Sequence, residues 1–62
     1  MKELGRKTMD VVNTWLKRYE AGQITKREFY ILIRGLYDAT SGLMEKAFTQ
    51  ILVDILEDLR RE

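Results

Sequence analysis

The stretch EAGQITKREF, residues 20–29, predicts where the chain turns. Gly22 suits the position just after a helix, because glycine adopts the left-handed conformation found there without steric cost. Thr25 is a preferred N-cap residue, and Glu28 stands three positions later, which is the capping-box arrangement. One helix therefore ends at this stretch and a second begins within it, with only a short corner between them.

A calcium-binding loop is the competing interpretation of the same stretch. If Gly22 were the sixth residue of an EF-hand loop, then Lys17, Tyr19 and Ala21 would hold the first, third and fifth positions. Those positions need oxygen ligands, which are usually carboxylates. None of the three supplies a carboxylate, so Glu28 is better interpreted as a cap. The sequence predicts no metal and no other cofactor.

Three apolar patterns with helical spacing predict an all-α fold with three helices. They cover about residues 4–21, 26–40 and 42–60, and together they make residues 1–62 a single helical domain. Ile24 precedes the N-cap of the second helix and Phe29 follows it at the fourth helical position, which is the placement of a hydrophobic staple. The corner is therefore specified by polar caps and by apolar packing at the same time.

The connection between the second and third helices leaves two architectures open. Only TSG, residues 40–42, separates the two apolar patterns, and the chain has no proline to force a stop. In one architecture the chain turns at Ser41 and Gly42 into a three-helix bundle, with Ser41 capping the third helix. In the other it forms a hairpin whose long second helix runs from Thr25 to about Arg60. That long helix has too little apolar cover within its own chain, so the hairpin is expected to dimerise.

The segment WLKRYEAGQITKREFYILIRGL, Trp15 to Leu36, resembles the SHOCT family of short helical hairpins. The shared elements are an apolar helix end, Gly22, the pair Ile24 and Thr25, the pair Glu28 and Phe29, and a second apolar helix. The resemblance covers about a third of the chain. It implies an interaction or oligomerisation element without catalytic residues. The hairpins of that family usually stand at the C-terminus of larger proteins, whereas this one lies in the middle of the chain.

Composition argues against several classes of function. The chain has no cysteine and no histidine, which removes the thiolate, the usual general base and the commonest metal ligand. A run of about 18 apolar residues, the length needed to span a membrane, is absent. The polar start lacks the apolar core of a signal peptide, so a cytoplasmic protein is expected. An enzyme is not expected, because a bundle of 62 residues scarcely forms a pocket for acid–base catalysis.

The small net charge of +1 conceals an asymmetry between the two halves of the chain. Residues 1–34 carry eight Lys or Arg against four Asp or Glu, whereas residues 35–62 carry three against six. A nucleic-acid-binding protein usually shows a stronger basic excess. A candidate basic patch flanks the corner and consists of Lys17, Arg18, Lys26 and Arg27. A helix-turn-helix-like DNA-binding regulator therefore remains an alternative function, although SGLMEKAFTQ is a poor opening for a recognition helix.

Apolar surface in excess of one core predicts a protein partner. The apolar residues of the third helix span roughly 220° of its circumference, and a helix that buries one side needs little more than 100°. In the second helix a stripe of mostly small residues, Ile31, Gly35, Ala39 and Gly42, would let another backbone approach closely. The candidate interface comprises Tyr30, Ile31, Gly35, Ala39, Leu52, Val53 and Leu56.

The function predicted from the sequence is therefore a small protein-protein interaction module without catalysis. It would act as an adaptor, an oligomerisation unit or an inhibitor by burying apolar helix surface against a partner. The expected partners are another protein and a second copy of the chain, as a homodimer. Proteins of this kind often come from phages or mobile elements, so such an origin is part of the expectation.

Overall fold

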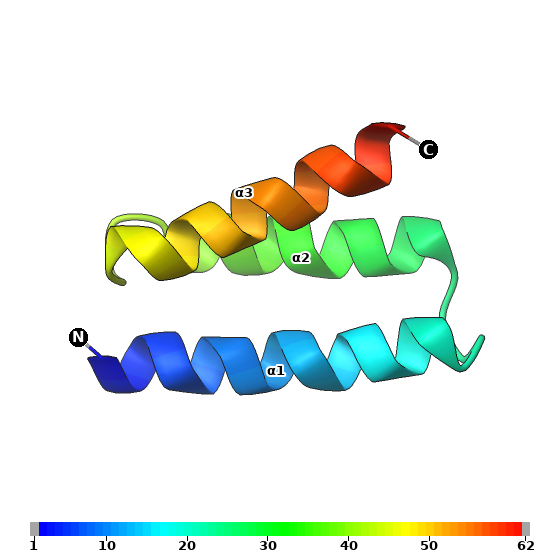
Figure 1. The fold of residues 1–62 in the computed structure, drawn as a ribbon, viewed down its shortest axis with the longest axis horizontal. Coiled ribbons are helices and arrows are strands. Elements are labelled where there is room, and N and C mark those ends of the chain that lie inside the picture. Colours follow the sequence, from blue (N-terminus) through cyan, green and yellow to red (C-terminus); the bar gives the residue numbers. More distant parts are fainter. Residues whose placement is uncertain (1, 62) are drawn as a thin grey trace.

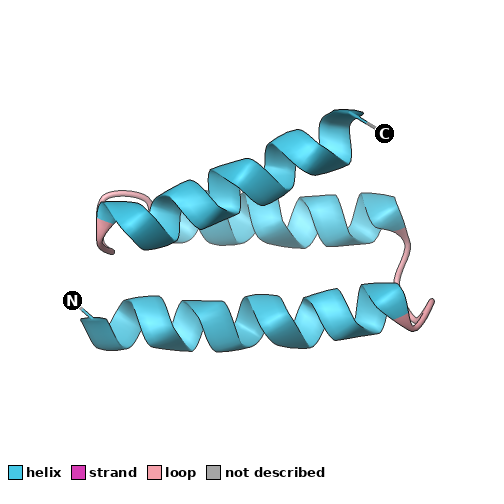
Figure 2. Ribbon diagram, in the orientation of Figure 1, coloured by secondary structure: helices cyan, strands magenta, loops and turns pink. Residues whose placement is uncertain are grey.

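The computed structural model describes residues 2–61 as three α-helices joined by two short loops. Helix α1 spans Lys2–Glu20, α2 spans Lys26–Thr40 and α3 spans Lys46–Arg61. The two loops lie at opposite ends of the molecule (Figure 2), and the described part of the chain contains no strand. The predicted all-α bundle of three helices is therefore confirmed. Residues 1 and 62 of the predicted domain lie outside the described residues.

Helix α2 is the central element of the bundle. Helix α1 runs antiparallel to α2, and α3 crosses α2 while running back in the direction of α1 (Figure 1). Both outer helices pack mainly against α2 and contact each other little. The Cα atoms extend 32 × 21 × 15 Å, so the molecule is flat and has two broad faces. The apolar sides that α1 and α3 turn toward each other are consequently covered only in part.

The corner after α1 has the hydrogen bonds of a Schellman motif. The Gln23 N–H donates to the Arg18 carbonyl oxygen at 2.8 Å, and the Gly22 N–H donates to the Tyr19 carbonyl oxygen at 3.0 Å. Gly22 has a φ of 76°, which a residue with a Cβ adopts only at a steric cost. The prediction that Gly22 ends the first helix is confirmed.

The capping box predicted at the start of α2 is also present. The Glu28 N–H donates to Thr25 Oγ1 at 3.1 Å, and the Thr25 N–H donates to Glu28 Oε1 at 2.9 Å. The hydrogen bond that the Glu28 carboxylate accepts from the Thr25 backbone lowers the pKa of Glu28 below its ordinary value of 4.5, and the interaction with the Thr25 side chain lowers it further. The pKa of Glu28 is therefore lower in the folded chain than in the unfolded chain. The ionised Glu28 stabilises the folded state above about pH 4.5, and this stabilisation is lost as the pH falls through the folded pKa.

Replacing the N-cap Thr25 by alanine is expected to lower the free energy of unfolding by about 1 kcal/mol. Alanine cannot accept the hydrogen bond from the Glu28 N–H, so an orphan donor is left at the start of α2. Urea denaturation followed by circular dichroism measures the effect. Thr14→Ala is the matched control, since Thr14 is exposed in the middle of α1 and alanine is the better helix former. An equal loss in both variants would contradict a specific role for the cap.

The core lies where α1 and α3 both meet α2. Phe29 is 1% exposed, and Ile33 and Leu52 have no exposed area. The Phe29 ring stacks on Tyr19 of α1, with ring centroids 5.0 Å apart and an interplanar angle of 12°. The buried apolar cluster consists of Val12, Phe29, Ile33, Met44, Leu52, Leu56 and Leu59. Ile24 and Trp15 pack against this cluster, so the proposed staple residue and the single tryptophan both support the core.

The second connection turns at Ser41 and Gly42, as the predicted three-helix bundle requires, but it is longer than predicted. Helix α2 ends at Thr40, and the Ser41 N–H donates to the Tyr37 carbonyl oxygen at 2.8 Å, which makes Ser41 the C-cap of α2 rather than a cap of α3. Gly42 then has a φ of 83°, a conformation incompatible with a continuous helix. Helix α3 begins only at Lys46, four residues later than predicted. The hairpin with one long second helix is therefore not the architecture of this chain.

Gly5 allows close packing between α1 and α3. It lies buried within α1, opposite the start of α3. A Cβ at this position would lie 2.9 Å from Phe48 Cγ and closer still to two other atoms of the ring. The absence of a side chain at Gly5 therefore allows the Phe48 ring to lie directly on the α1 backbone.

Candidate protein interface

An apolar surface lies along the side on which α1 and α3 face each other. We call it the α1/α3 face and define it by Met9 and Leu16 of α1 and by Phe48, Ile51 and Ile55 of α3. Ile51 is 42% exposed and Leu16 is 36% exposed, while the other three side chains are half-buried against the core. Large apolar side chains with this exposure leave apolar area in contact with water on one broad face.

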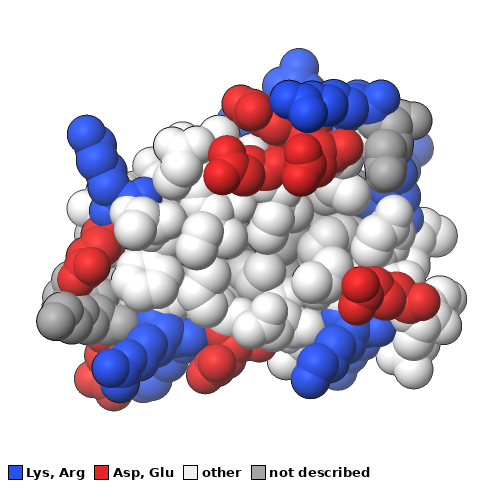
Figure 3. Space-filling model, in the orientation of Figure 1, with Lys and Arg blue, Asp and Glu red and all other residues white. Residues whose placement is uncertain are grey.

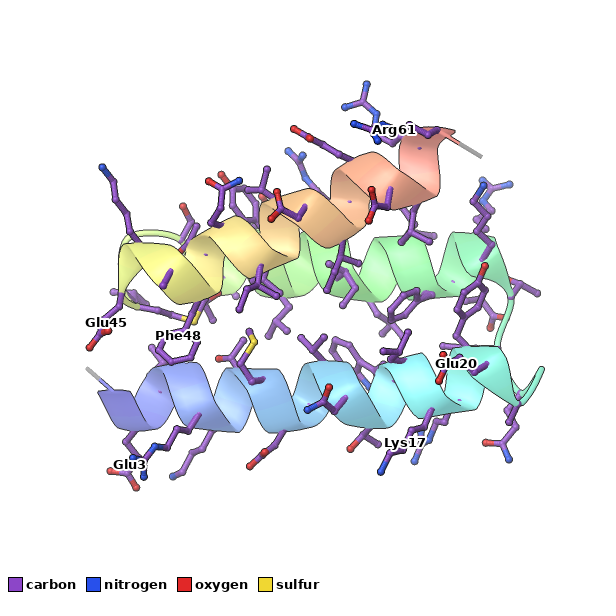
Figure 4. All side chains as sticks on the ribbon, in the orientation of Figure 1. Glu3, Lys17, Glu20, Glu45, Phe48 and Arg61 are labelled. Carbon is purple, nitrogen blue, oxygen red and sulfur yellow. The ribbon has the colours of Figure 1, made fainter. Side chains whose placement is uncertain are left out.

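Helical spacing places these five side chains on the same side of the molecule. The contact between Gly5 and the Phe48 ring identifies the side of α1 that faces α3. Met9 and Leu16 follow Gly5 by four and eleven residues, and Ile51 and Ile55 follow Phe48 by three and seven, all of which are same-side spacings in a helix. Figure 4 shows Phe48 pointing from α3 toward α1.

Charged side chains lie at the edges of this face rather than in its centre. Figure 3 shows a broad uncharged band between α1 and α3, with acidic side chains gathered along the α3 edge. Asp54 and Asp58 belong to that edge, because each follows one of the two isoleucines of the face by three residues. The α1 edge is mixed, with Arg6, Asn13 and Glu20 next to the apolar side chains. An apolar centre with a polar rim is the anatomy of a protein interface.

A groove lies on the opposite side of α3, where this helix crosses α2. We call it the α2/α3 groove. It has a volume of about 150 Å³ and is lined by Tyr30, Arg34, Tyr37, Val53, Leu56, Glu57 and Arg60. Leu56 is 6% exposed and forms the floor, while the two tyrosines and Val53 are half-buried. Val53 follows Ile51 by two residues, which places it about 200° further around the helix. The groove and the α1/α3 face are therefore separate surfaces.

The structure places the seven predicted interface residues in three different environments. Those that line the α2/α3 groove are Tyr30, Val53 and Leu56. Those that lie exposed on the outward side of α2 are Ile31, Gly35 and Ala39. Leu52 is wholly buried. Leu52 is thus a core residue with no surface to offer a partner, and Leu56 offers only the 6% that forms the floor of the groove, because both fall in the middle of the apolar arc that α3 packs against α2.

The small-residue stripe on α2 is open to approach but presents little apolar area. A Cβ added at Gly35 would meet no heavy atom within 4 Å. Ile31 is 58% exposed, yet it is the only large apolar side chain of the stripe. Arg34 and Asp38 lie beside it and pair with each other at 3.5 Å. The stripe stays a predicted interface, with less apolar surface than the α1/α3 face.

Most of the residues that build the two surfaces cannot be recognised as interface residues in the sequence. In the groove these are Arg34, Tyr37, Glu57 and Arg60. A signal was present on α2, because Tyr30, Arg34 and Tyr37 are spaced by four and three residues and therefore share one side. The contribution of α3 had no such signal, since it depends on how α3 crosses α2.

The candidate basic patch flanks the turn between α1 and α2, as its sequence positions require. Lys17 and Arg18 are exposed in the last turn of α1, and Arg27 is exposed in the first turn of α2, where Lys26 is half-buried. Lys17 points away from α3 (Figure 4). Cations in the last turn of α1 interact favourably with the negative end of the helix dipole, so their position has a structural explanation without a ligand.

Neither a metal cage nor a membrane-spanning helix is found in the described chain. Among residues 2–61 no three acidic side chains gather closely enough to hold a metal ion. None of the helices described here is both long enough and apolar enough to cross a bilayer. A wider depression beside the groove is lined by Glu57, Arg60 and Arg61, all exposed, and has no apolar floor.

Comparison of the chain with protein-family models, with curated proteins and with solved structures gives no match.

Proposed function

We propose that the protein is a small, non-catalytic protein-protein interaction module whose working surface is the α1/α3 face. It acts as an adaptor, an oligomerisation unit or an inhibitor by burying that face against a partner, and the first partner is a second copy of the chain. The observation that supports this proposal is the exposure of Ile51 and Leu16, 42% and 36%, together with the uncharged band between α1 and α3 (Figure 3).

The size of the face suits a standard interface. A stable complex buries about 800 Å² on each partner, which is roughly a sixth of the 4600 Å² that the chain exposes. The broad side of the molecule, 32 Å by 21 Å between Cα atoms, has room for that area. Burial of apolar area contributes about 25 cal/mol per Å² before the costs of association.

A two-fold axis parallel to the helices gives this face a self-complementary arrangement. Such an axis places α1 of each copy against α3 of the other, so the apolar sides of four helices share one centre. It also brings the acidic edge of α3 opposite the mixed edge of α1, which carries Arg6, Asn13 and Glu20. An isologous contact of this kind repeats every favourable pair twice.

Light scattering across a concentration series tests the proposal directly. The expected result is a mass of twice 7.4 kDa at high concentration, falling toward a single chain on dilution, with helicity followed by circular dichroism. A folded monomer at every concentration would contradict self-association through this face.

The carboxylates of α3 argue against the DNA-binding alternative. Helix α3 would be the recognition helix, and its exposed side carries Asp54, Glu57 and Asp58. These carboxylates would repel the phosphate backbone that contributes most of the affinity for DNA.

A further inference from the structure

We propose that the α2/α3 groove binds an acidic segment of a partner protein, taking one apolar side chain between its tyrosines and a neighbouring carboxylate at its two arginines. The groove lies on the opposite side of α3 from the α1/α3 face, so this binding site goes beyond the proposed self-association. The two surfaces can be occupied at the same time, and a dimer would present two identical grooves.

The volume and lining of the groove fit a single side chain of a peptide. About 150 Å³ is the space of roughly five water molecules, less than the 300 Å³ or more of a typical small-molecule pocket. Val53 and the nearly buried Leu56 supply an apolar floor, and the half-buried rings of Tyr30 and Tyr37 form a wall. An aliphatic side chain placed there would lose contact with water where it meets this floor and wall.

Arginines stand on both helices that border the groove. Arg34 belongs to α2, and its guanidinium carbon lies 5.9 Å from the centre of the Tyr37 ring, while Nε is 3.5 Å from Asp38 Oδ2. Neither contact uses the terminal nitrogens of the guanidinium group, which we assign to a carboxylate of the ligand. Arg60 belongs to α3 and, within residues 2–61, pairs with no carboxylate. Planar guanidinium groups bind carboxylates through two parallel hydrogen bonds.

The combination of residues favours a protein segment over other ligands. Tyrosine and arginine are the residue types that contribute most to binding at protein interfaces. The lining carries two cations and one anion, Glu57, and Arg34 is already paired with Asp38, so Arg60 is the main attraction for an acidic group. The tyrosine hydroxyls add donors beside the apolar floor.

A titration with a defined peptide tests the groove. The probe is a fluorescein-labelled pentapeptide with a central leucine flanked on each side by two glutamates, followed by anisotropy and by the arginine Nε–H signals in NMR spectra. We expect saturable binding that shifts the signals of Arg34 and Arg60 and weakens as salt is added. The double variant R34A/R60A is expected to bind at least tenfold more weakly, because charge-assisted hydrogen bonds are lost.

The matched control separates a groove from general electrostatic attraction. K17A/R18A removes the same number of positive charges at exposed positions of α1 and is expected to keep full affinity. Equal weakening in both double variants would overturn the proposal, as would equal binding of a peptide with lysines in place of the glutamates. Absence of peptide binding would also overturn it. The mass of each variant, measured by light scattering, reports self-association independently, so failure of the groove is distinguishable from failure of the dimer.

Discussion

Replacement of Phe29 by alanine is expected to unfold the chain at room temperature. Phe29 is 1% exposed and is among the three largest fully buried side chains, together with Ile33 and Leu52. Loss of a buried phenylalanine costs about 3–5 kcal/mol, because the transfer of the ring out of water is lost and a cavity remains. A domain of fewer than about 70 residues rarely obtains more than 3–5 kcal/mol from its core. The expected loss therefore equals the whole stability of the monomer.

The position of Phe29 makes this effect larger than that of any substitution at the caps. Its ring stacks on Tyr19 and thereby joins α2 to α1. Far-UV circular dichroism measures the outcome as a loss of helical signal. Ile31→Ala is the matched control, since Ile31 lies two residues away on α2 and is 58% exposed. Retention of full helicity and a cooperative thermal transition in Phe29→Ala would contradict the assignment of this ring to the core.

The turn between α1 and α2 could be predicted from the sequence because the interactions that stabilise it are all local. The glycine conformation, the capping box and the two hydrogen bonds of the Schellman motif involve residues at most five positions apart. The residue types at these positions have strong and specific preferences: glycine just after a helix, as at Gly22, threonine at an N-cap, as at Thr25, and glutamate three residues later, as at Glu28. No tertiary contact is needed to decide such a structure.

The second connection could not be predicted as well because its decisive contact is tertiary. Ser41 and Gly42 permit a turn without enforcing one, and the apolar phase continues across them. Met44, however, is only 8% exposed, so the loop folds back and places this side chain in the core. That packing delays the start of α3 to Lys46. The helical periodicity of the sequence does not reveal the free energy gained by burying one methionine.

The excess apolar arc of the third helix is divided between the core and two separate surfaces. The middle of the arc, Leu52 and Leu56, packs against α2. Its two margins diverge, with Ile51 on the α1/α3 face and Val53 in the groove. The sequence indicated that α3 has more apolar surface than one core can use. It could not indicate which residues are left over, because that depends on the angle at which α3 crosses α2.

Ile51→Glu is expected to convert a dimer into a folded monomer. Ile51 is 42% exposed near the centre of the α1/α3 face, and glutamate is a good helix former, so the variant keeps its helicity. In a dimer the new carboxylate would be buried without a cation and would lie close to Asp54 on the same helix. We expect the dissociation constant to rise at least tenfold, and far more if the site is dry, as measured by light scattering or sedimentation equilibrium.

The same substitution on α2 decides whether the dimer forms through the α1/α3 face or through the stripe on α2. Ile31→Glu places an identical charge on the outward stripe, where Ile31 is 58% exposed. A dimer through the α1/α3 face leaves that position in water, so Ile31→Glu should keep the mass of the dimer while Ile51→Glu loses it. The reverse result would assign self-association to the stripe of Ile31, Gly35 and Ala39, whose small residues allow close approach of two helices. Because both variants carry the same net charge, a change in general solubility affects them equally, and the difference between them isolates the geometry.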